Sequence, residues 1–229
     1  SFSNDSKFIY YRKDEFKKGL KYSSIYKQEI STKKKETILS GNREVSPPLI
    51  TKQGNCFFTQ KGKVKYITQQ GKPVDKSKLA KESPVVLNED GNLYVFMNGS
   101  KRLINPSGKN AYIWAELSPN EKYIVYTVAA DQTYICDLNG KIKYKLGYAN
   151  APKWSPDGKW ILFMDDKNNG DNYTSSELWV VSMDGSKRIQ LTKTDDEIEL
   201  YPEWSPSGNK ITYHNLDGNI FILAVGRKD

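Results

Sequence analysis

Short apolar runs separated by polar turns recur along the chain, most clearly in residues 151–193. Apolar residues fill Trp160–Met164 and Leu178–Met183, and turn-forming residues fill Pro156–Gly158 and Asp184–Gly185. Asp-Gly provides the positive backbone dihedral angles of a two-residue hairpin, and Pro followed by Asp-Gly fixes a second tight turn. The pattern predicts an antiparallel meander of four strands. Because one meander cannot bury both of its faces, the pattern also predicts neighbouring copies.

The sequence contains such copies. Ser155–Phe163 aligns on its turn with Ser118–Tyr126 and Ser205–Tyr213. Three fainter copies are Ser3–Tyr11, Thr51–Phe58 and Asn88–Val95. Strand repeats with a period of roughly 30 to 50 residues are typical of a β-propeller with four-stranded antiparallel blades. Six repeat starts therefore predict an all-β fold with six blades.

We expect residues 1–229 to form a single propeller domain. Its six predicted blades are residues 1–45, 46–82, 83–110, 111–149, 150–195 and 196–229. In the third blade, Asn92–Met97 and Lys101–Ile104 resemble the third and fourth strands of the central meander, so a five-bladed ring is the alternative. Pro73–Lys81 is interpreted as either an outer strand or a loop.

The first and last blades along the chain are each expected to be one strand short. The first blade has no innermost strand before Ser1, and the last ends after Asn219–Val225 without a fourth strand. We expect that a few flanking N-terminal residues are missing. The charged residues Arg227–Asp229 would help to protect the open edge.

The best-matching copies carry a recognisable motif. Pro152–Lys159 reads Pro-x-Trp-Ser-Pro-Asp-Gly-Lys, and Pro202–Gly208 repeats it. The motif resembles the TolB-type β-propeller repeat, which also occurs in the propeller domains of prolyl-oligopeptidase-like peptidases. The resemblance implies that the motif residues are structural, with Trp154 and Trp204 packed between blades. It also implies an extracytoplasmic bacterial setting, in the periplasm or at the cell surface.

Positive charge is concentrated in the first third of the chain. The formal net charge is +8, and residues 1–82 hold 19 Lys and Arg against 8 Asp and Glu. This asymmetry indicates a docking face for an acidic partner or an anionic ligand. A solvated lysine-rich surface is the alternative, and the small number of arginines favours it. Lys33–Lys35 is predicted to mark an exposed hairpin tip or strand edge, and we expect no nucleic acid partner.

The sequence offers little catalytic chemistry. Its only histidine, His214, is expected to be structural, and no cysteine has metal-ligand spacing. A G-x-S-x-G nucleophile motif and phosphate-binding loops are absent. Cys56 and Cys136 are interpreted as buried free thiols, with a disulfide as the alternative. We therefore predict no catalytic, cofactor-binding or metal-binding residues.

Two acidic segments could in principle form a binding site. Asp166–Asp171, followed by Glu177, superficially resembles a calcium loop. Gly170 is out of register with such a loop and the flanking segments are strands, so an ordinary hairpin loop is favoured. Asp195–Glu199 is predicted to be an exposed acidic connection, with an acidic patch at the propeller mouth as the alternative.

Three classes of function remain. The leading one, implied by the TolB resemblance, is a non-enzymatic, monomeric propeller that binds a protein or peptide in the bacterial cell envelope. The second is a binder of carbohydrate or anionic ligands through channel-lining Tyr and Lys residues. The third is an enzyme, either a polysaccharide lyase or hydrolase, or the accessory domain of a peptidase. Without a run of about 18 apolar residues, no transmembrane segment is expected.

Overall fold

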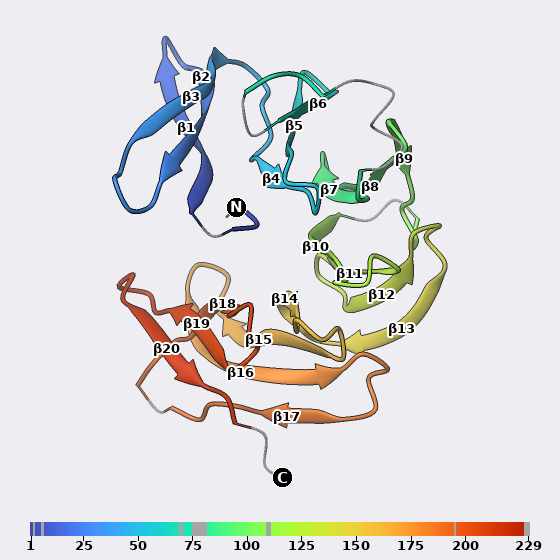
Figure 1. The fold of residues 1–229 in the computed structure, drawn as a ribbon. Helices are drawn as coiled ribbons and strands as arrows, with labels where there is room; N and C mark the ends of the chain where they lie inside the picture. Colours follow the sequence, from blue (N-terminus) through green and yellow to red (C-terminus); the bar gives the residue numbers. More distant parts are fainter. Residues whose placement is uncertain are drawn as a thin grey trace. The chain divides into compact units, whose positions relative to one another are not determined.

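Short antiparallel sheets make up all of the regular structure that is described. The computed structural model describes residues 1, 3–5, 7–68, 71–74, 82–108, 111–194 and 196–226. Within these ranges every regular element is a β-strand, and the strands form six sheets (Figure 1). The all-β prediction is therefore confirmed. No helix in these ranges has the length and apolar character needed to span a bilayer.

The chain divides into two compact units. The first consists of residues 1–85 and 96–101, and the second of residues 86–95 and 102–229. One three-stranded sheet, made of β7 (Val85–Glu89), β8 (Asn92–Met97) and β9 (Ser100–Leu103), supplies residues to both units. The apolar pattern of the sequence does not reveal β7, because the second half of this strand is polar.

Two three-stranded sheets belong to the first unit. One contains β1 (Phe8–Lys17), β2 (Leu20–Glu29) and β3 (Lys35–Asn42). The other contains β4 (Leu49–Ile50), β5 (Cys56–Gln60) and β6 (Lys63–Ile67). Their shared core consists of Tyr10, Ile25, Val45, Cys56 and Phe58. Pro73 forms an isolated bridge with Ile67, while residues 75–81 lie outside the described residues.

The first hairpin extends well beyond its apolar residues. The apolar run indicated a strand only over Phe8–Tyr11, but β1 continues to Lys17. Polar residues extend the ladder because Lys18 and Gly19 form a tight turn with φ angles of 50° and 73°, which matches the twist of paired strands. Lys33 and Lys34 lie in the exposed turn before β3, as predicted.

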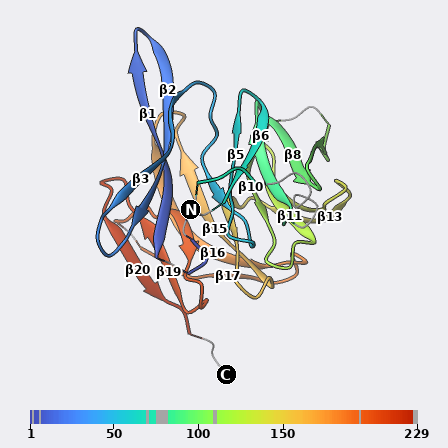
Figure 2. The ribbon, with the colours of Figure 1, turned by 45° about the horizontal axis from the view of Figure 1, so that its top comes forward.

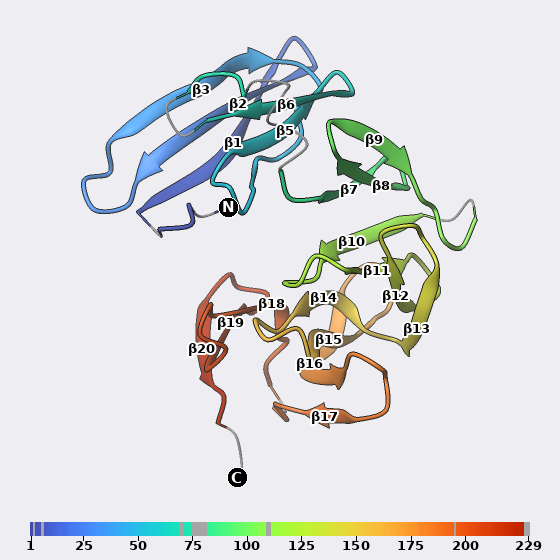
Figure 3. The same cartoon turned by 45° about the vertical axis from the view of Figure 1, so that its right-hand side comes forward.

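Three sheets belong wholly to the second unit, and they follow one another along the chain (Figures 1 and 3). The first is four-stranded, with β10 (Tyr112–Leu117), β11 (Tyr123–Val128), β12 (Thr133–Asp137) and β13 (Ile142–Gly147). The next is the predicted central meander, with β14 (Asn150–Trp154), β15 (Trp160–Asn168), β16 (Tyr173–Ser182) and β17 (Arg188–Gln190). The last has three strands, β18 (Leu200–Trp204), β19 (Lys210–His214) and β20 (Ile220–Ala224). Arg227–Asp229, expected to guard its edge, lies outside the described residues.

Serine closes a turn directly before a strand in four of the repeats, and in three of them that turn joins the first and second strands of a sheet. Ser155 Oγ accepts a hydrogen bond from the backbone N–H of Trp160, five positions further on (3.0 Å). Ser3, Ser118 and Ser205 accept the same bond, at 2.9 to 3.0 Å. The shared geometry, called here the Ser-Pro turn after its three clearest copies, shows that the faint copy at Ser3 has the same turn.

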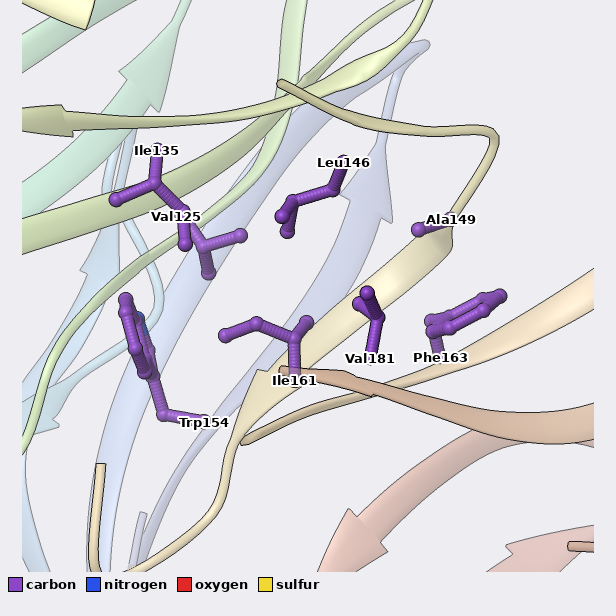
Figure 4. Close-up of a cluster of buried hydrophobic side chains, with 8 residues drawn as sticks. All are labelled: Val125, Ile135, Leu146, Ala149, Trp154, Ile161, Phe163 and Val181. Carbon is purple, nitrogen blue, oxygen red and sulfur yellow. The ribbon is translucent and has the colours of Figure 1, made fainter. Parts of the chain in front are cut away.

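The motif tryptophans pack between sheets of the second unit, as expected. Trp154 is 5% exposed and lies among apolar side chains of β10–β13 and β14–β17 (Figure 4). Its indole N–H donates to the backbone carbonyl of Glu116 across 3.3 Å. Trp204 is half-buried against the cluster formed by β14–β17 and β18–β20. Cys56 and Cys136 are buried free thiols, which confirms that prediction.

Candidate functional site

A row of three charged side chains crosses the first strands of the three sheets in the second unit. The charged row consists of Glu116 on β10, Lys153 on β14 and Glu203 on β18. Each residue lies two positions before the serine of its Ser-Pro turn, so the three positions are equivalent in the repeat. Lys153 Nζ lies 2.7 Å from Glu203 Oε2, and the Glu116 carboxylate accepts the backbone N–H of Trp154 at 2.9 Å.

The charged row has unusual protonation behaviour. Burial raises the pKa of Glu116 to about 7, although Lys153 and the Trp154 amide act in the opposite direction. Burial alone would lower the pKa of Lys153, but Glu116 and Glu203 outweigh it and raise that pKa. Lys153 therefore stays charged, while Glu116 exchanges a proton near neutral pH.

A repeated backbone distortion lies next to the charged row. Trp114, Ala151 and Tyr201 adopt φ angles of 51°, 47° and 49°, and the strand register shifts at each of them. A left-handed residue other than glycine costs about 1–3 kcal/mol, so packing in the second unit must offset this cost three times. Bulges of this kind redirect side chains and are frequent beside functional sites. Sequence reasoning missed them, and their only signal is the shared repeat position.

Four aromatic side chains gather near the starts of β14 and β18. This aromatic cluster consists of Tyr148, Tyr173, Tyr201 and His214. The rings of Tyr201 and His214 stack with centroids 5.6 Å apart and an interplanar angle of 17°. Tyr173 shares a hydrogen bond with Tyr201, which raises the pKa of Tyr173. Tyr148 and Tyr201 are 41% and 46% exposed, so both rings are accessible.

Polar groups support one side of the aromatic cluster. The Tyr148 hydroxyl donates to the backbone carbonyl of Asp166 at 2.7 Å. The Asn150 amide donates to the Tyr148 hydroxyl oxygen at 2.9 Å and to the buried Asp166 carboxylate at 2.8 Å. Burial and the nearby Asp166 carboxylate raise the pKa of Tyr148 to about 12. The phenol therefore stays protonated and keeps its hydrogen bond to Asp166, which holds the ring in place.

The structure shows where the candidate residues of the sequence analysis lie. His214 stacks on Tyr201, and its Nδ1 lies 2.9 Å from the backbone carbonyl oxygen of Asn215. The predicted hairpin loop at Asp166–Asp171 is shorter than expected, because Asp166–Asn168 belong to β15, where Asp166 is buried, and only residues 169–172 form the loop between β15 and β16. Among the described residues, no group of three or more His, Cys, Asp or Glu is placed to hold a metal ion.

The prediction of an exposed acidic connection is wrong for Glu199. This residue is fully buried, its carboxylate accepts a hydrogen bond from Thr192, and its backbone carbonyl accepts one from Ser176. Burial raises the pKa of its carboxyl group. The neighbouring Ile198 pairs with Ser176 of β16, and this bridge draws the segment against the sheet. Asp195 lies outside the described residues.

The small antiparallel sheets and their repeated turns define a β-propeller fold of the TolB type. TolB from Acinetobacter baumannii superimposes with a TM-score of 0.60 at 19% identity, over 96% of this chain and 61% of that one. A putative TolB from Agrobacterium tumefaciens gives a TM-score of 0.56 at 19% identity, over 89% of this chain and 90% of that one. The predicted TolB-type fold is thereby confirmed.

The other comparisons give a lower TM-score, cover less of the chain or find no match. An oligogalacturonate lyase solved in complex with manganese gives a TM-score of 0.54 at 12% identity, over 99% of this chain and 64% of that one. An uncharacterized protein of Agrobacterium fabrum (strain C58) is 30% identical over an alignment of 115 positions, which covers 47% of this chain and 37% of the relative. The chain thus spans 37% of that curated relative and 61% of the Acinetobacter TolB chain. No family model matches.

Proposed function

We propose that the protein is a non-enzymatic propeller scaffold that binds a protein or peptide segment in the bacterial cell envelope. The observation that carries the proposal is that Lys153 and Glu203 of the charged row lie on β14 and β18, near the starts of which the aromatic cluster gathers. On β18, Tyr201 of the aromatic cluster lies two positions before Glu203. On β14, Asn150, which donates a hydrogen bond to Tyr148 of the cluster, lies three positions before Lys153. Exposed aromatic rings beside partly buried charges are typical of protein-binding hot spots.

The charges of the row suggest the chemistry of the bound segment. Two carboxylates face one ammonium group, so the row carries a net negative charge when Glu116 is ionised. A Lys or Arg side chain of the partner would complement this charge. The tyrosine rings of the aromatic cluster would contact apolar or aromatic side chains of the same segment.

The absence of enzymatic activity is part of the proposal. The single histidine of the sequence stacks on Tyr201 and lies beside a backbone carbonyl, so its ring is already engaged. Glu116, whose pKa is raised to about 7, has no histidine, cysteine or serine nucleophile among its described partners. A scaffold role fits these residues better than acid–base catalysis.

Carbohydrate binding is the second candidate, favoured by one arrangement. The exposed ring of Tyr148 stands beside the amide of Asn150, and an aromatic ring next to an amide is an arrangement that a sugar can contact. The lyase neighbour shows a shared fold alone at 12% identity. It therefore adds no weight to this candidate.

Parallel peptide and glycan arrays separate the two candidates. The test variants are Lys153→Glu in the charged row and Tyr201→Asn, since asparagine tolerates the left-handed backbone. Lys210→Glu, an exposed lysine on β19, serves as the charge control. We expect binding to basic peptides that both test variants abolish and the control retains. Glycan binding without peptide binding would favour the second candidate, and cleavage products would contradict the scaffold proposal.

A further inference from the structure

The tip of the first hairpin is a two-stranded ribbon, and none of the described strands pairs with it as a third. β3 pairs with Ser23–Gln28 of β2 and ends there, whereas β1 and β2 stay paired out to Lys17 and Leu20. Figure 2 shows the β1–β2 hairpin extending beyond β3. A two-stranded ribbon buries little and contributes little to stability. Its length therefore needs another reason.

Two large apolar side chains occupy this exposed tip. Residues 15–21 are all exposed, and within them Phe16 is 73% exposed and Leu20 is 42% exposed. Phe16 pairs with Lys21 while Leu20 pairs with Lys17, so the two apolar side chains point to opposite faces of the ribbon. A partner with a flat surface would cover only one of them. A lipid surface into which the tip inserts would cover both apolar side chains.

Basic residues surround the apolar tip. Lys13, Lys17, Lys18 and Lys21 lie within five positions of Phe16. The nearby carboxylates are already paired within the hairpin. Glu15 lies 3.5 Å from Lys13 and 3.6 Å from Lys17, and Asp14 contacts Arg12 at 2.9 Å and Lys21 at 3.8 Å. Residues 7–35 together contain ten Lys and Arg against three Asp and Glu, so the positive excess persists.

The tip has the dimensions of an interfacial anchor. Two strand positions and the Lys18–Gly19 turn extend about 7–10 Å, at roughly 3.3 Å for each residue. Apolar groups that bind at a bilayer surface enter the boundary between headgroups and acyl chains by about 5–10 Å. At that depth the flanking lysines would reach the level of the lipid phosphates, where anionic lipids attract them.

We propose that this tip docks the protein on the surface of an anionic phospholipid bilayer. Phe16 and Leu20 enter the headgroup region, and the surrounding lysines contact the lipid phosphates. The exposed apolar pair distinguishes this surface from the solvated lysine-rich face that composition alone suggests. The proposal concerns the first unit and is independent of the peptide site in the second.

Vesicle cosedimentation tests the proposal. The probes are vesicles of phosphatidylcholine alone and of phosphatidylcholine mixed with phosphatidylglycerol, at low and high salt. The apolar variant is Phe16→Ser with Leu20→Ser, and the charge variant is Lys17→Glu with Lys18→Glu. The controls lie in the second unit and make the same changes at exposed positions: Ile220→Ser with Ile222→Ser, and Lys141→Glu with Lys210→Glu.

We expect the unmodified protein to sediment only with the anionic vesicles, and less at high salt. Each tip variant should weaken binding by about tenfold or more, whereas each control should retain most of it. Lack of binding to anionic vesicles, or equal losses in tip and control variants, would overturn the proposal. Loss in the charge variant alone would also overturn it, because the apolar pair would then have no role.

Insertion itself has a separate readout. Leu20→Cys can be labelled with an environment-sensitive dye, since both native cysteines are buried. Anionic vesicles should shift the emission of the dye to the blue. An unshifted spectrum in a sample that sediments with the vesicles would show attachment by lysines alone and contradict insertion. Circular dichroism of every variant confirms that the sheets remain folded.

Discussion

Trp154 and Glu116 are joined by two hydrogen bonds between neighbouring sheets of the second unit. The Trp154 backbone N–H donates to the Glu116 carboxylate at 2.9 Å, and its indole N–H donates to the Glu116 backbone carbonyl at 3.3 Å. The same tryptophan fills the core between these sheets (Figure 4). One repeat residue therefore both stabilises the sheet packing and holds a member of the charged row in place.

Replacing Trp154 with alanine should strongly destabilise the protein. The side chain is 5% exposed and contacts residues of two sheets, so its loss leaves a cavity and removes the indole hydrogen bond. We expect the free energy of unfolding to fall by about 3–5 kcal/mol. Trp204→Ala, at a half-buried position, should cost less. Urea titrations of the two variants measure the difference, and equal losses would contradict the packing described.

The protonation of Glu116 should make stability depend on pH. Its pKa is raised to about 7 in the folded state, so folding favours the protonated form. The stabilising contribution is present below the pKa of the unfolded chain and is lost as the pH rises through about 7, by roughly 1–3 kcal/mol. Urea unfolding between acidic and mildly alkaline pH measures this slope. Glu116→Gln should flatten it, and an unchanged slope in that variant would refute the assignment.

Replacing a turn glycine of the repeat should reduce stability even where the surrounding atoms leave room for a side chain. Gly158 has a φ angle of 69°, and an added methyl group would meet only Pro119, at 3.8 Å. Gly158→Ala should therefore destabilise the protein by about 1 kcal/mol through backbone strain alone. Glu121 occupies the equivalent turn position with a φ angle of 59°. Glu121→Gly should change the midpoint of thermal unfolding in the opposite direction.

The two cysteines should resist modification in the native protein. Burial raises the pKa of Cys56 and of Cys136 to about 12, so almost no thiolate is present at neutral pH. A thiol reagent should therefore label neither residue until the protein unfolds, and should then label both. Rapid labelling of one thiol under native conditions would show that its sheet opens locally.

The sequence was informative where local chemistry dictates structure. Asp-Gly and Ser-Pro segments impose specific backbone angles, so the turns and the strands beside them follow from the residues alone. The apolar run Trp160–Met164 lies within β15, and the run Leu178–Met183 lies within β16 except for its last residue, because alternating and buried strands require such residues. The same logic failed for β1 and β7, whose polar halves are held by pairing with a neighbour.

The candidate site was not visible in the sequence. Glu116, Lys153 and Glu203 are separated by dozens of positions, and each one alone resembles an ordinary surface charge. The left-handed angles at Trp114, Ala151 and Tyr201 run against the preference of those side chains, so no propensity indicates them. Sheet packing supplies the energy that holds these angles.

By itself, the sequence determined the strand class, the repeat and the turns, because these follow from backbone preferences and from the period of apolar residues. Only the tertiary structure decided which distant side chains meet, which carboxyl groups are buried and how far the first hairpin extends. Those properties depend on packing between sheets, where desolvation and long-range pairing outweigh local preference. The raised pKa of Glu116 and the exposed apolar tip at Phe16 both result from the tertiary structure.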